Sequence, residues 1–385
     1  MRSFLSLVVL VLLGTTIQAT PAPQVVPQKG GPSGGGGGGT DDPGAGSTGN
    51  GIPNVTDAQN AVCVPWYAVR DAIMGGLFQG RCTDIARAAI RLAFHDAGTF
   101  SLNLQENALP NGGPDGSIMT DPNEVMRSEN NGLQQIVSLL NPIAAEFGVS
   151  PADTLQLAGI LGVLACPGGP KINFWVGRPA PRNIAPMGLL PSPEGAVPDL
   201  IARFADMGLT VRDMIALIGA HTTGKQQFVN PAQANSTFDT TVDIWDTRFY
   251  TQTQAAAVEP GTLKLDSDVY FSTNASTAAE FSRFIGGQDL WTTDYAAAHE
   301  QMSILGLSTS QLTSCTEILP LSIDLSTVID APATGKNGGS GGGGGGGSGS
   351  GSNKPVTDPP VDPVKLEAAI QEFRSIWLVP GTVTT

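Results

Sequence analysis

Hydrophobic residues recur at the spacing of one helix face in several parts of the chain. The clearest case is T-D-I-A-R-A-A-I-R-L-A-F-H-D-A-G-T-F, residues 83–100. At 3.6 residues per turn, Arg91 and His95 lie four apart on one face, whereas Asp96 points away from that face. This stretch predicts a helix that presents a basic side chain next to a titratable one.

Other stretches extend the helical pattern. Periodic apolar positions predict helices within residues 66–77, 133–140, 200–205, 278–284 and 295–305. The almost wholly apolar run 154–165 predicts a buried helix. Thr210-Val-Arg-Asp213 has the form of a capping box, and the helix it opens would end at His221, just before Gly224. Residues 100–123 are typical of a loop, and the one strand predicted is short, at 174–176. The predicted fold class is mainly α.

The composition points to one folded domain between less ordered segments. Of the 385 residues, 49 are Gly, concentrated in two tracts. Residues 1–19 have the form of a cleaved secretory signal. We predict a Pro/Gly-rich flexible leader at 20–56, a folded domain at 57–333, a Gly/Ser linker at 334–356 and a tail at 357–385. Leu366, Ile370, Phe373 and Trp377 space as a short amphipathic helix, which could dock on a partner or on the body.

Charge narrows the range of partners. The net charge of -14 and the pI near 4.5 argue against nucleic acid and anionic membranes, since both would repel the chain. The apolar run of the signal is too short to span a bilayer, and no later apolar stretch reaches that length. We therefore expect a secreted, extracellular monomer that acts on small neutral or cationic molecules. Three glycosylation acceptor sequences, at Asn54, Asn235 and Asn274, agree with secretion.

The chain has four cysteines: Cys63, Cys82, Cys166 and Cys315. An even number in an oxidising compartment predicts two disulfides. The residues alone leave all three possible pairings open.

Only three histidines occur, and two of them lie in strongly predicted helices. A single helical histidine is more often structural than functional. His95 and His221, however, are each followed by an oxygen-bearing residue, and two oxygen-rich loops lie nearby in the sequence. The two sets are Asp96, Gly113, Asp115 and Ser117, and Thr222, Asp239, Thr241, Ile244 and Asp246. Calcium takes six to eight oxygen ligands, so each set is a candidate calcium site, although the spacing is not that of an EF-hand and solvated turns are the alternative.

Four motifs together resemble a known family. R-L-A-F-H-D-A-G-T-F, P-D-G-S-I, C-P-G-G-P and A-L-I-G-A-H-T-T-G-K are similar, in order and spacing, to the secreted fungal haem peroxidases of the plant peroxidase superfamily. The resemblance covers roughly residues 57–332. It implies a two-lobed, mainly α-helical fold with haem b between a distal and a proximal helix. It also implies two Ca²⁺ ions, at the two oxygen-rich sets.

The resemblance assigns residues on both haem faces. His221 would bind the haem iron, and Asp268 would accept a hydrogen bond from its other ring nitrogen. On the distal face, His95 would act as base and then acid toward hydrogen peroxide, and Arg91 would stabilise developing negative charge. The remaining implied distal residues are Phe94, Asn130 and Glu124, the last two as a relay that orients His95. The adjacent Asn131 could match the same family position as Asn130, so this assignment is open by one residue.

The resemblance also implies the pairings Cys82 with Cys166 and Cys63 with Cys315, and it narrows the electron donor. Members that oxidise Mn(II) carry three acids at positions occupied here by Asp84, Ala88 and Gln227, and only one is acidic. The surface tryptophan of members that oxidise bulky lignin units is Ala216 here. We therefore expect small phenols or aromatic amines as donors.

Two alternatives stay open: Mn(II) oxidation at an atypical site, and a calcium-stabilised wall or matrix module without haem activity. Trp175, Trp245 and Trp291 could serve as radical sites, but packing is the favoured interpretation for each. His299 belongs to no motif, so a structural or exposed position is expected for it.

Overall fold

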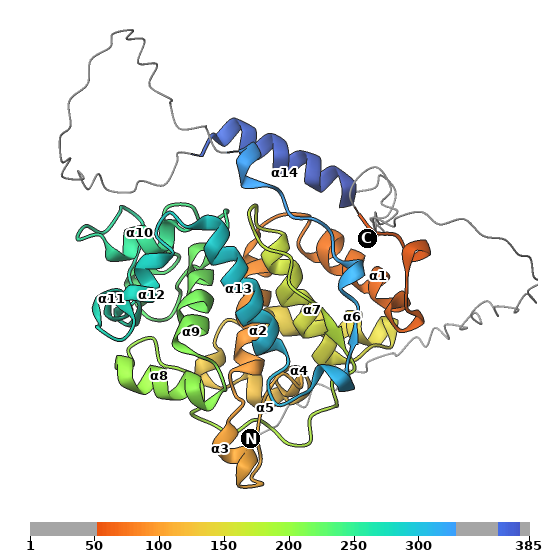
Figure 1. Cartoon of the computed structure of the whole chain (residues 1–385). Coiled ribbons are helices and arrows are strands. Elements are labelled where there is room, and N and C mark those ends of the chain that lie inside the picture. The colour runs from red at the N-terminus through yellow and green to blue at the C-terminus, as the bar shows by residue number, and fades with distance from the viewer. Residues whose placement is uncertain (1–51, 329–360, 378–385) are drawn as a thin grey trace, which may run out of the picture. The chain divides into compact units, whose positions relative to one another are not determined.

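The computed structural model describes residues 52–328 and 361–377 (Figure 1). The predicted signal, the whole predicted linker and the predicted leader up to residue 51 lie outside the described residues. The α-helices are α1 (Val64–Asp71), α2 (Asp84–Ala97), α3 (Leu102–Glu106), α4 (Ser117–Thr120), α5 (Pro122–Val125), α6 (Gln134–Phe147), α7 (Pro151–Leu164), α8 (Val197–Asp206), α9 (Val211–Ile218), α10 (Arg248–Gln254), α11 (Asp266–Thr273), α12 (Ala278–Arg283), α13 (Gln288–Ser303) and α14 (Pro363–Trp377).

Short helical segments and one pair of strands complete the described secondary structure. The 3-10 segments are η1 (Val55–Asp57), η2 (Ala61–Cys63), η4 (Ser128–Asn130), η5 (Gly219–Thr223), η6 (Pro231–Gln233), η7 (Thr309–Gln311), η8 (Thr316–Ile318) and η9 (Leu325–Thr327), and η3 (Ala72–Leu77) is a π-helix. Strands β1 (Trp175–Val176) and β2 (Thr313–Ser314) pair antiparallel. The prediction of a mainly α fold is confirmed.

Helix α2 forms where the sequence predicts it, because its cap and its apolar face agree. The Thr83 hydroxyl accepts a hydrogen bond from the Ala86 amide at 3.2 Å, which satisfies one free donor of the first turn. The buried side of α2 packs on α7, most of which is buried. Glycines allow the close approach: a Cβ atom on Gly159 would lie 2.5 Å from the Cβ of Ala93, and one on Gly162 would lie 2.5 Å from the Ala86 carbonyl oxygen. This contact fixes α2 against the core.

Helix α9 begins at the predicted capping box. Thr210 accepts from the Asp213 amide at 3.2 Å, and the Asp213 carboxylate accepts from the Thr210 amide at 2.8 Å. The chain continues directly into η5, which carries His221 and ends before Gly224. Helix α13 contacts both α9 and α2, so it joins the two histidine-bearing parts of the molecule.

Both disulfides are present. Cys63 bonds to Cys315 and Cys82 bonds to Cys166, which is the pairing that the resemblance implies. The first closes a separation of 252 residues and ties η2 to the segment after β2. The second closes 84 residues and holds the chain just before α2 to the chain just after α7. Each bridge of this kind contributes about 2–4 kcal/mol, mainly by restricting the unfolded chain.

Several short helices differ from the sequence prediction. Residues 100–123, predicted as a loop, contain α3, α4 and the start of α5. Helices α10 and α11 carry few regularly spaced apolar residues, so periodicity gives no signal for them. Tertiary packing supplies their stability instead: Phe249 and Tyr250 of α10 and Phe271 of α11 are at most 3% exposed.

The predicted tail helix forms and packs on the body. Ile370 and Phe373 of α14 are each 7% exposed, and α14 contacts η3 and η9. Its partners include Arg81, which pairs with Glu367 at 3.4 Å, and the Gln79 carbonyl, which accepts from Arg374 at 3.2 Å. Of the two partners considered for this helix, the structure therefore places it on the body.

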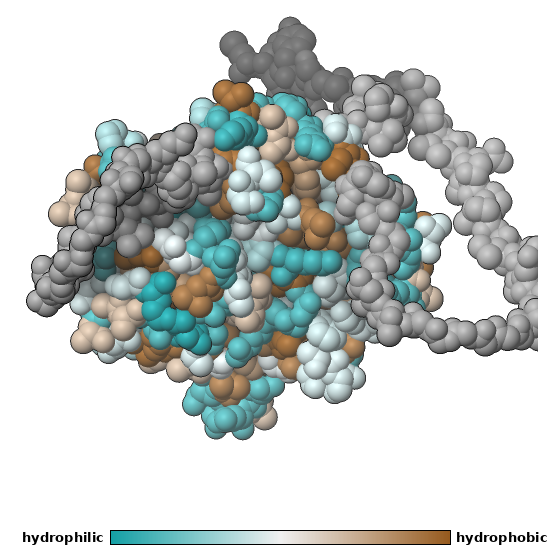
Figure 2. Space-filling model, turned by 45° about the horizontal axis from the view of Figure 1, so that its top comes forward, coloured by the Kyte–Doolittle hydropathy of each residue, from teal (hydrophilic) through white to brown (hydrophobic). Residues whose placement is uncertain are grey.

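In the view of Figure 2, hydrophobic residues are interspersed with hydrophilic ones on the visible face. No helix within the two described ranges is both long enough and apolar enough to cross a bilayer.

Candidate active site

Arg91 and His95 are in direct contact on the open face of α2. The Arg91 Nε donates to Nε2 of His95 at 3.1 Å. The guanidinium is held in place by two carbonyl oxygens, those of Asn131 at 2.8 Å and Glu129 at 2.9 Å. Loss of hydration within the surrounding protein lowers the pKa of Arg91 to about 10, so Arg91 keeps its charge at neutral pH. A fixed cation therefore stands beside the imidazole.

The other nitrogen of His95 is held by Asn130. Nδ1 lies 2.8 Å from the Asn130 side-chain oxygen, an atom that can only accept. The proton of the neutral ring is therefore on Nδ1, and Nε2 keeps its lone pair. Burial and the Arg91 charge lower the pKa of His95 to about 3, which keeps the ring neutral. In a neutral imidazole of this tautomer the Nε2 lone pair, which here accepts the hydrogen bond from Arg91, is the site that can take a proton from a ligand on this face.

Asn130 is in turn oriented by Glu124, through the backbone and not through the carboxylate. The Asn130 amide nitrogen donates to the Glu124 carbonyl oxygen at 2.7 Å. The Glu124 carboxylate is buried and accepts instead from the Ser117 hydroxyl at 3.2 Å and the Ala185 amide at 3.0 Å. Glu124 thus links the His95 relay to the oxygen-rich loop that contains Ser117.

His221 lies at the end of η5 and is hydrogen-bonded to Asp268 of α11. Its Nδ1 lies 2.9 Å from Oδ2 of Asp268. Burial lowers the pKa of His221 and the Asp268 carboxylate raises it, and the balance is a raised pKa. The Asp268 side chain is 2% exposed, whereas the His221 ring is 33% exposed. Nε2 lies on the ring edge opposite the Asp268 contact, and the rings of Phe238 and Phe249 lie 5.1 and 5.5 Å from the His221 ring.

The first oxygen-rich set gathers around Asp96. Both Asp96 carboxylate oxygens accept from the Gly116 amide at 3.1 Å, and Asp115 accepts from the Ser117 amide at 2.9 Å. Asp96 is 0% exposed. Burial and the neighbouring Asp115 raise the pKa of Asp96 well above its usual range. Two close carboxylates surrounded by backbone and hydroxyl oxygens form a donor set that suits a hard cation such as calcium.

The second set gathers around Thr222. Its hydroxyl donates to Asp239 at 2.6 Å and lies 3.4 Å from Asp246, and the Thr241 hydroxyl lies 3.1 Å from Asp246. Burial and the charge of Asp246 raise the pKa of Asp239 to about 8. Ile244, the fifth predicted member, is in the same turn, where its amide donates to the Thr241 carbonyl at 2.8 Å. A divalent cation would relieve the repulsion between these two carboxylates.

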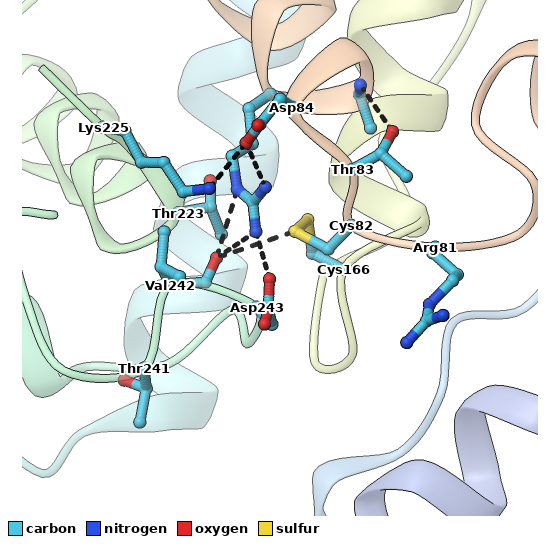
Figure 3. Close-up of polar contacts among 12 residues, drawn as sticks. Arg81, Cys82, Thr83, Asp84, Cys166, Thr223, Lys225, Thr241, Val242 and Asp243 are labelled. Carbon is cyan, nitrogen blue, oxygen red and sulfur yellow. Dashed lines mark hydrogen bonds and ion pairs between the residues drawn. A yellow bond between two sulfur atoms is a disulfide. The ribbon is translucent and has the colours of Figure 1, made fainter. Parts of the chain in front are cut away.

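A network that the sequence did not predict joins the start of α2 to the segment after His221 (Figure 3). Asp84 accepts from Lys225 at 2.8 Å and from Arg87 at 2.8 Å, and the hydrogen bond from Lys225 lowers the pKa of Asp84. Arg87 also donates to the Val242 carbonyl at 3.1 Å and pairs with Asp243. Only the i, i+3 spacing of Asp84 and Arg87 was visible in the sequence, because the other partners are far along the chain.

Comparison with known proteins decides the family. The model of the family described as Peroxidase matches residues 69–287, more than half of the chain. The chain belongs to the peroxidase family.

Its relatives are fungal peroxidases of class II. It is 34% identical over 284 residues to manganese peroxidase 3 of Phlebia radiata, covering 69% of this chain and 78% of that protein. It is 32% identical over 285 residues to ligninase H2 of Phanerodontia chrysosporium, covering 69% and 77%. It is 30% identical over 299 residues to a peroxidase of Arthromyces ramosus, covering 73% and 82%. The chain is thus an oxidoreductase that acts on hydrogen peroxide.

A peroxidase of this family uses haem, and the residues present fit that group. Asp268 occupies Nδ1 of His221, so Nε2 is the nitrogen left to bind iron. No hydrogen bond within the described residues engages that atom. His95 is partly exposed, and among the described residues its Nε2 is hydrogen-bonded to the Arg91 guanidinium alone.

A mostly apolar surface pocket includes Glu129, the residue whose carbonyl oxygen accepts a hydrogen bond from Arg91. The pocket, of about 360 Å³, is lined by Glu129, Met187, Gly188 and Leu190. The exposed Phe228 ring also lies near Arg91, because a Cβ atom on Gly132 would stand 3.0 Å from Phe228 and 3.6 Å from the Arg91 guanidinium. Sequence reasoning missed these residues, since no motif or periodicity marks them.

Proposed function

We propose that this peroxidase reduces hydrogen peroxide with His95 and Arg91 and takes the electrons from small phenols or aromatic amines. When bound, haem supplies the iron that binds peroxide and exchanges electrons with it. His221 would hold that iron through Nε2, and Asp268 would make the imidazole a stronger electron donor. The observation that carries the proposal is the neutral His95, with Nδ1 committed to Asn130 and Nε2 next to Arg91.

In this proposal, His95 transfers one proton of the peroxide and Arg91 stabilises the negative charge that develops on it. His95 Nε2 would accept a proton from one oxygen of hydrogen peroxide and return it to the other, which would leave as water, with the electrons supplied by the haem. Arg91 stabilises the negative charge that develops as the O–O bond breaks. Asn130 keeps the proton of the resting imidazole on Nδ1, and Phe94, whose ring lies 6.0 Å from that of His95, shapes the distal side.

The donor assignment rests on the surface pocket that Glu129 lines and on Asp84. The apolar pocket and the exposed Phe228 suit a flat aromatic donor that approaches the haem edge. Mn(II) needs several carboxylates, and the one acid retained, Asp84, already neutralises Lys225 and Arg87. Manganese oxidation is therefore disfavoured, although one relative is named as a manganese peroxidase.

The proposal also includes two calcium ions and secretion. The Asp96 and Thr222 sets would each hold one Ca²⁺, and each set includes the residue that follows a catalytic histidine. Calcium would then keep His95 and His221 in place. Secretion and glycosylation remain predictions from the sequence, and monomeric behaviour does too.

Family membership favours the enzyme over a matrix module without haem activity, and absorption spectroscopy tests that choice. Haem-reconstituted protein is expected to show a Soret band that shifts when hydrogen peroxide is added. The absence of a Soret band after reconstitution would favour the matrix module.

Steady-state rates test the donor. We expect turnover with phenol and with an aromatic amine, and no saturable Mn(II) oxidation. As a matched comparison, Lys225→Ala alone should not create Mn(II) oxidation, because Ala88 and Gln227 still supply no acid. Adding Ala88→Glu and Gln227→Asp to it should. Saturable Mn(II) oxidation by the wild-type protein would overturn the donor assignment.

A further inference from the structure

A continuous set of buried aromatic rings leads away from the proximal histidine. The ring of Phe249 lies 5.5 Å from that of His221, and the adjacent Tyr250 lies 5.2 Å from Phe249. Tyr250 is 5.9 Å from Trp291, and Trp291 is 6.0 Å from Tyr295, all measured between ring centroids. Each step is therefore a direct contact between rings, the arrangement that favours electron transfer in short steps.

Two of these rings pack closely against the backbone of η5, the segment that carries His221. A Cβ atom on Gly219 would stand 2.4 Å from both the Trp291 indole nitrogen and the Tyr250 hydroxyl, so glycine is needed there. Gly219 is two residues before His221. Trp245 offers a parallel route between two of these rings. It stacks on Trp291 at 5.3 Å and lies 4.7 Å from Tyr295.

The oxidisable rings differ in where their protons can go. The Tyr250 hydroxyl donates to the Ile215 carbonyl at 2.7 Å, and the Trp291 nitrogen donates to the Ala216 carbonyl at 3.0 Å. A carbonyl oxygen is too weak a base to take up either proton. Among the described residues, the Trp245 nitrogen has no hydrogen-bond partner at all. If one of these three rings lost an electron, it would therefore keep its proton. The oxidising equivalent would then move on to a neighbouring ring.

Tyr295 is different, because its hydroxyl meets a base. The oxygen lies 3.1 Å from Nδ1 of His299, one helical turn later on α13. Both residues are at most 1% exposed, and Nε2 of His299 has no partner within the described residues. With the ring proton on Nε2, the phenol donates to Nδ1 and one donor is left unpaired. With it on Nδ1, the phenol proton and Nε2 would both be unpaired, so the first arrangement is favoured.

His299 stays neutral and able to accept a proton. Burial and the nearby Arg178 lower the pKa of His299 to about 4. Burial raises the pKa of Tyr295 above its usual range, so the phenol does not ionise by itself. An oxidised phenol, by contrast, is a strong acid, and a neutral imidazole at hydrogen-bond distance accepts its proton readily.

We infer that Tyr295 and His299 form a redox-active pair that takes up an oxidising equivalent from the peroxide reaction when no external donor arrives. The inference rests on the proposed function, which supplies hydrogen peroxide as the oxidant. Reduction of one peroxide to water withdraws two electrons from the protein and its cofactor. Tyr295 returns one of them, through Trp291 and Tyr250 toward His221, and its phenol proton moves to Nδ1 of His299. The products are a neutral tyrosyl radical and an imidazolium.

Because the pair is buried, it can store an oxidising equivalent but cannot serve as a second site at which external electron donors are oxidised. At 1% exposure, Tyr295 is out of reach of phenols in solution. The path ends there because Tyr295 alone among these rings has a base for its proton. A later electron from a donor at the haem edge reverses both transfers.

Electron paramagnetic resonance of the haem-loaded full chain tests the inference. The protein is mixed with hydrogen peroxide without donor and frozen, while an optical spectrum of the same sample records whether peroxide has reacted. We expect a tyrosyl signal that narrows when the tyrosine rings are deuterated. The signal should be lost in Tyr295→Phe, which removes only the hydroxyl. It should also be lost in His299→Gln, which keeps a hydrogen-bond acceptor but no base.

The chain contains only four tyrosines, so matched controls are available. Tyr270→Phe, at a 48% exposed position outside the ring contacts, should leave the signal unchanged, and so should Tyr67→Phe. An optical reaction with no tyrosyl signal, or a signal that survives in Tyr295→Phe, would overturn the inference alone. A sample that shows no optical reaction with peroxide would overturn the proposed function and, with it, the oxidant that the inference needs.

Discussion

Nδ1 of His95 lies 2.8 Å from the side-chain oxygen of Asn130, and this contact fixes which nitrogen of the imidazole is basic. Asn130 is 2% exposed and is itself held by the Glu124 carbonyl. The basicity of Nε2, on the side where we propose that peroxide binds, is thus set through the Nδ1 side of the ring.

Replacing that amide should slow the peroxide reaction. In Asn130→Leu the ring is free to place its proton on Nε2, so we expect the second-order rate constant with hydrogen peroxide to fall by about 100-fold, within the range of general acid–base effects. Stopped-flow absorbance measures it. Asn131→Ala is the matched control, because only the Asn131 backbone contacts Arg91, and it should react like the wild type. A slowed Asn131→Ala protein together with an unaffected Asn130→Leu protein would show instead that Asn131 orients His95.

The packing of α2 on α7 should be sensitive to one methyl group. Gly159→Ala places a Cβ atom 2.5 Å from that of Ala93, so we expect a loss of about 1–3 kcal/mol in the free energy of unfolding. Urea denaturation measures it. Gly76→Ala is the control, since nothing lies within 4 Å of its added Cβ atom. Equal stability of the two variants would show that α2 can move away from α7 without cost.

Local signals in the sequence predicted the parts of this fold that carry them. The spacing of Arg91 and His95 marked α2, and the Thr210–Asp213 capping box marked the start of α9, because caps and apolar faces are properties of neighbouring residues. Helices α10 and α11 were missed, since burial of Phe249 and Phe271 by distant segments holds them in place.

Long-range partners limited the prediction of the site in the same way. The four cysteines gave two disulfides, but only the family resemblance gave their pairing. Lys225 was missed because its partner Asp84 is 141 residues away. The pairing of Tyr295 with His299 was visible as an i, i+4 spacing, yet the sequence did not show that both are buried.

Calcium removal should loosen the proximal side. If the Thr222 set holds Ca²⁺, chelation leaves Asp239 and Asp246 facing each other without a cation, so we expect the thermal midpoint to fall by several degrees and to recover with added calcium. Circular dichroism follows the transition. Asp239→Asn should reduce the response to calcium, whereas Asp266→Asn, at an exposed position of α11, should not. An unchanged midpoint after chelation in both the wild type and Asp266→Asn would rule out a stabilising calcium.

Buried His299 should make the protein less stable in mild acid. Its pKa is about 4 in the folded chain and about 6.5 when unfolded, so the unfolded state binds the proton more tightly. Stability from this group is complete above about pH 6.5 and is lost as the pH falls toward 4, by on the order of 1–3 kcal/mol. Urea denaturation at several pH values should show a smaller acid loss in His299→Gln. Tyr295→Phe, which keeps the imidazole, should retain the loss, and equal slopes in all three proteins would contradict this account.

The central claim is that His221 holds the haem while His95 moves the peroxide proton, and one stopped-flow experiment tests both. Wild type, His221→Ala and His95→Leu are reconstituted with haem and mixed with hydrogen peroxide while the Soret band is recorded. We predict a normal band and a fast shift for the wild type, a lost or altered band for His221→Ala, and a normal resting band with a rate lower by about 100-fold or more for His95→Leu. A His221→Ala protein with the wild-type band and rate, or a His95→Leu protein that reacts as fast as the wild type, would contradict the account.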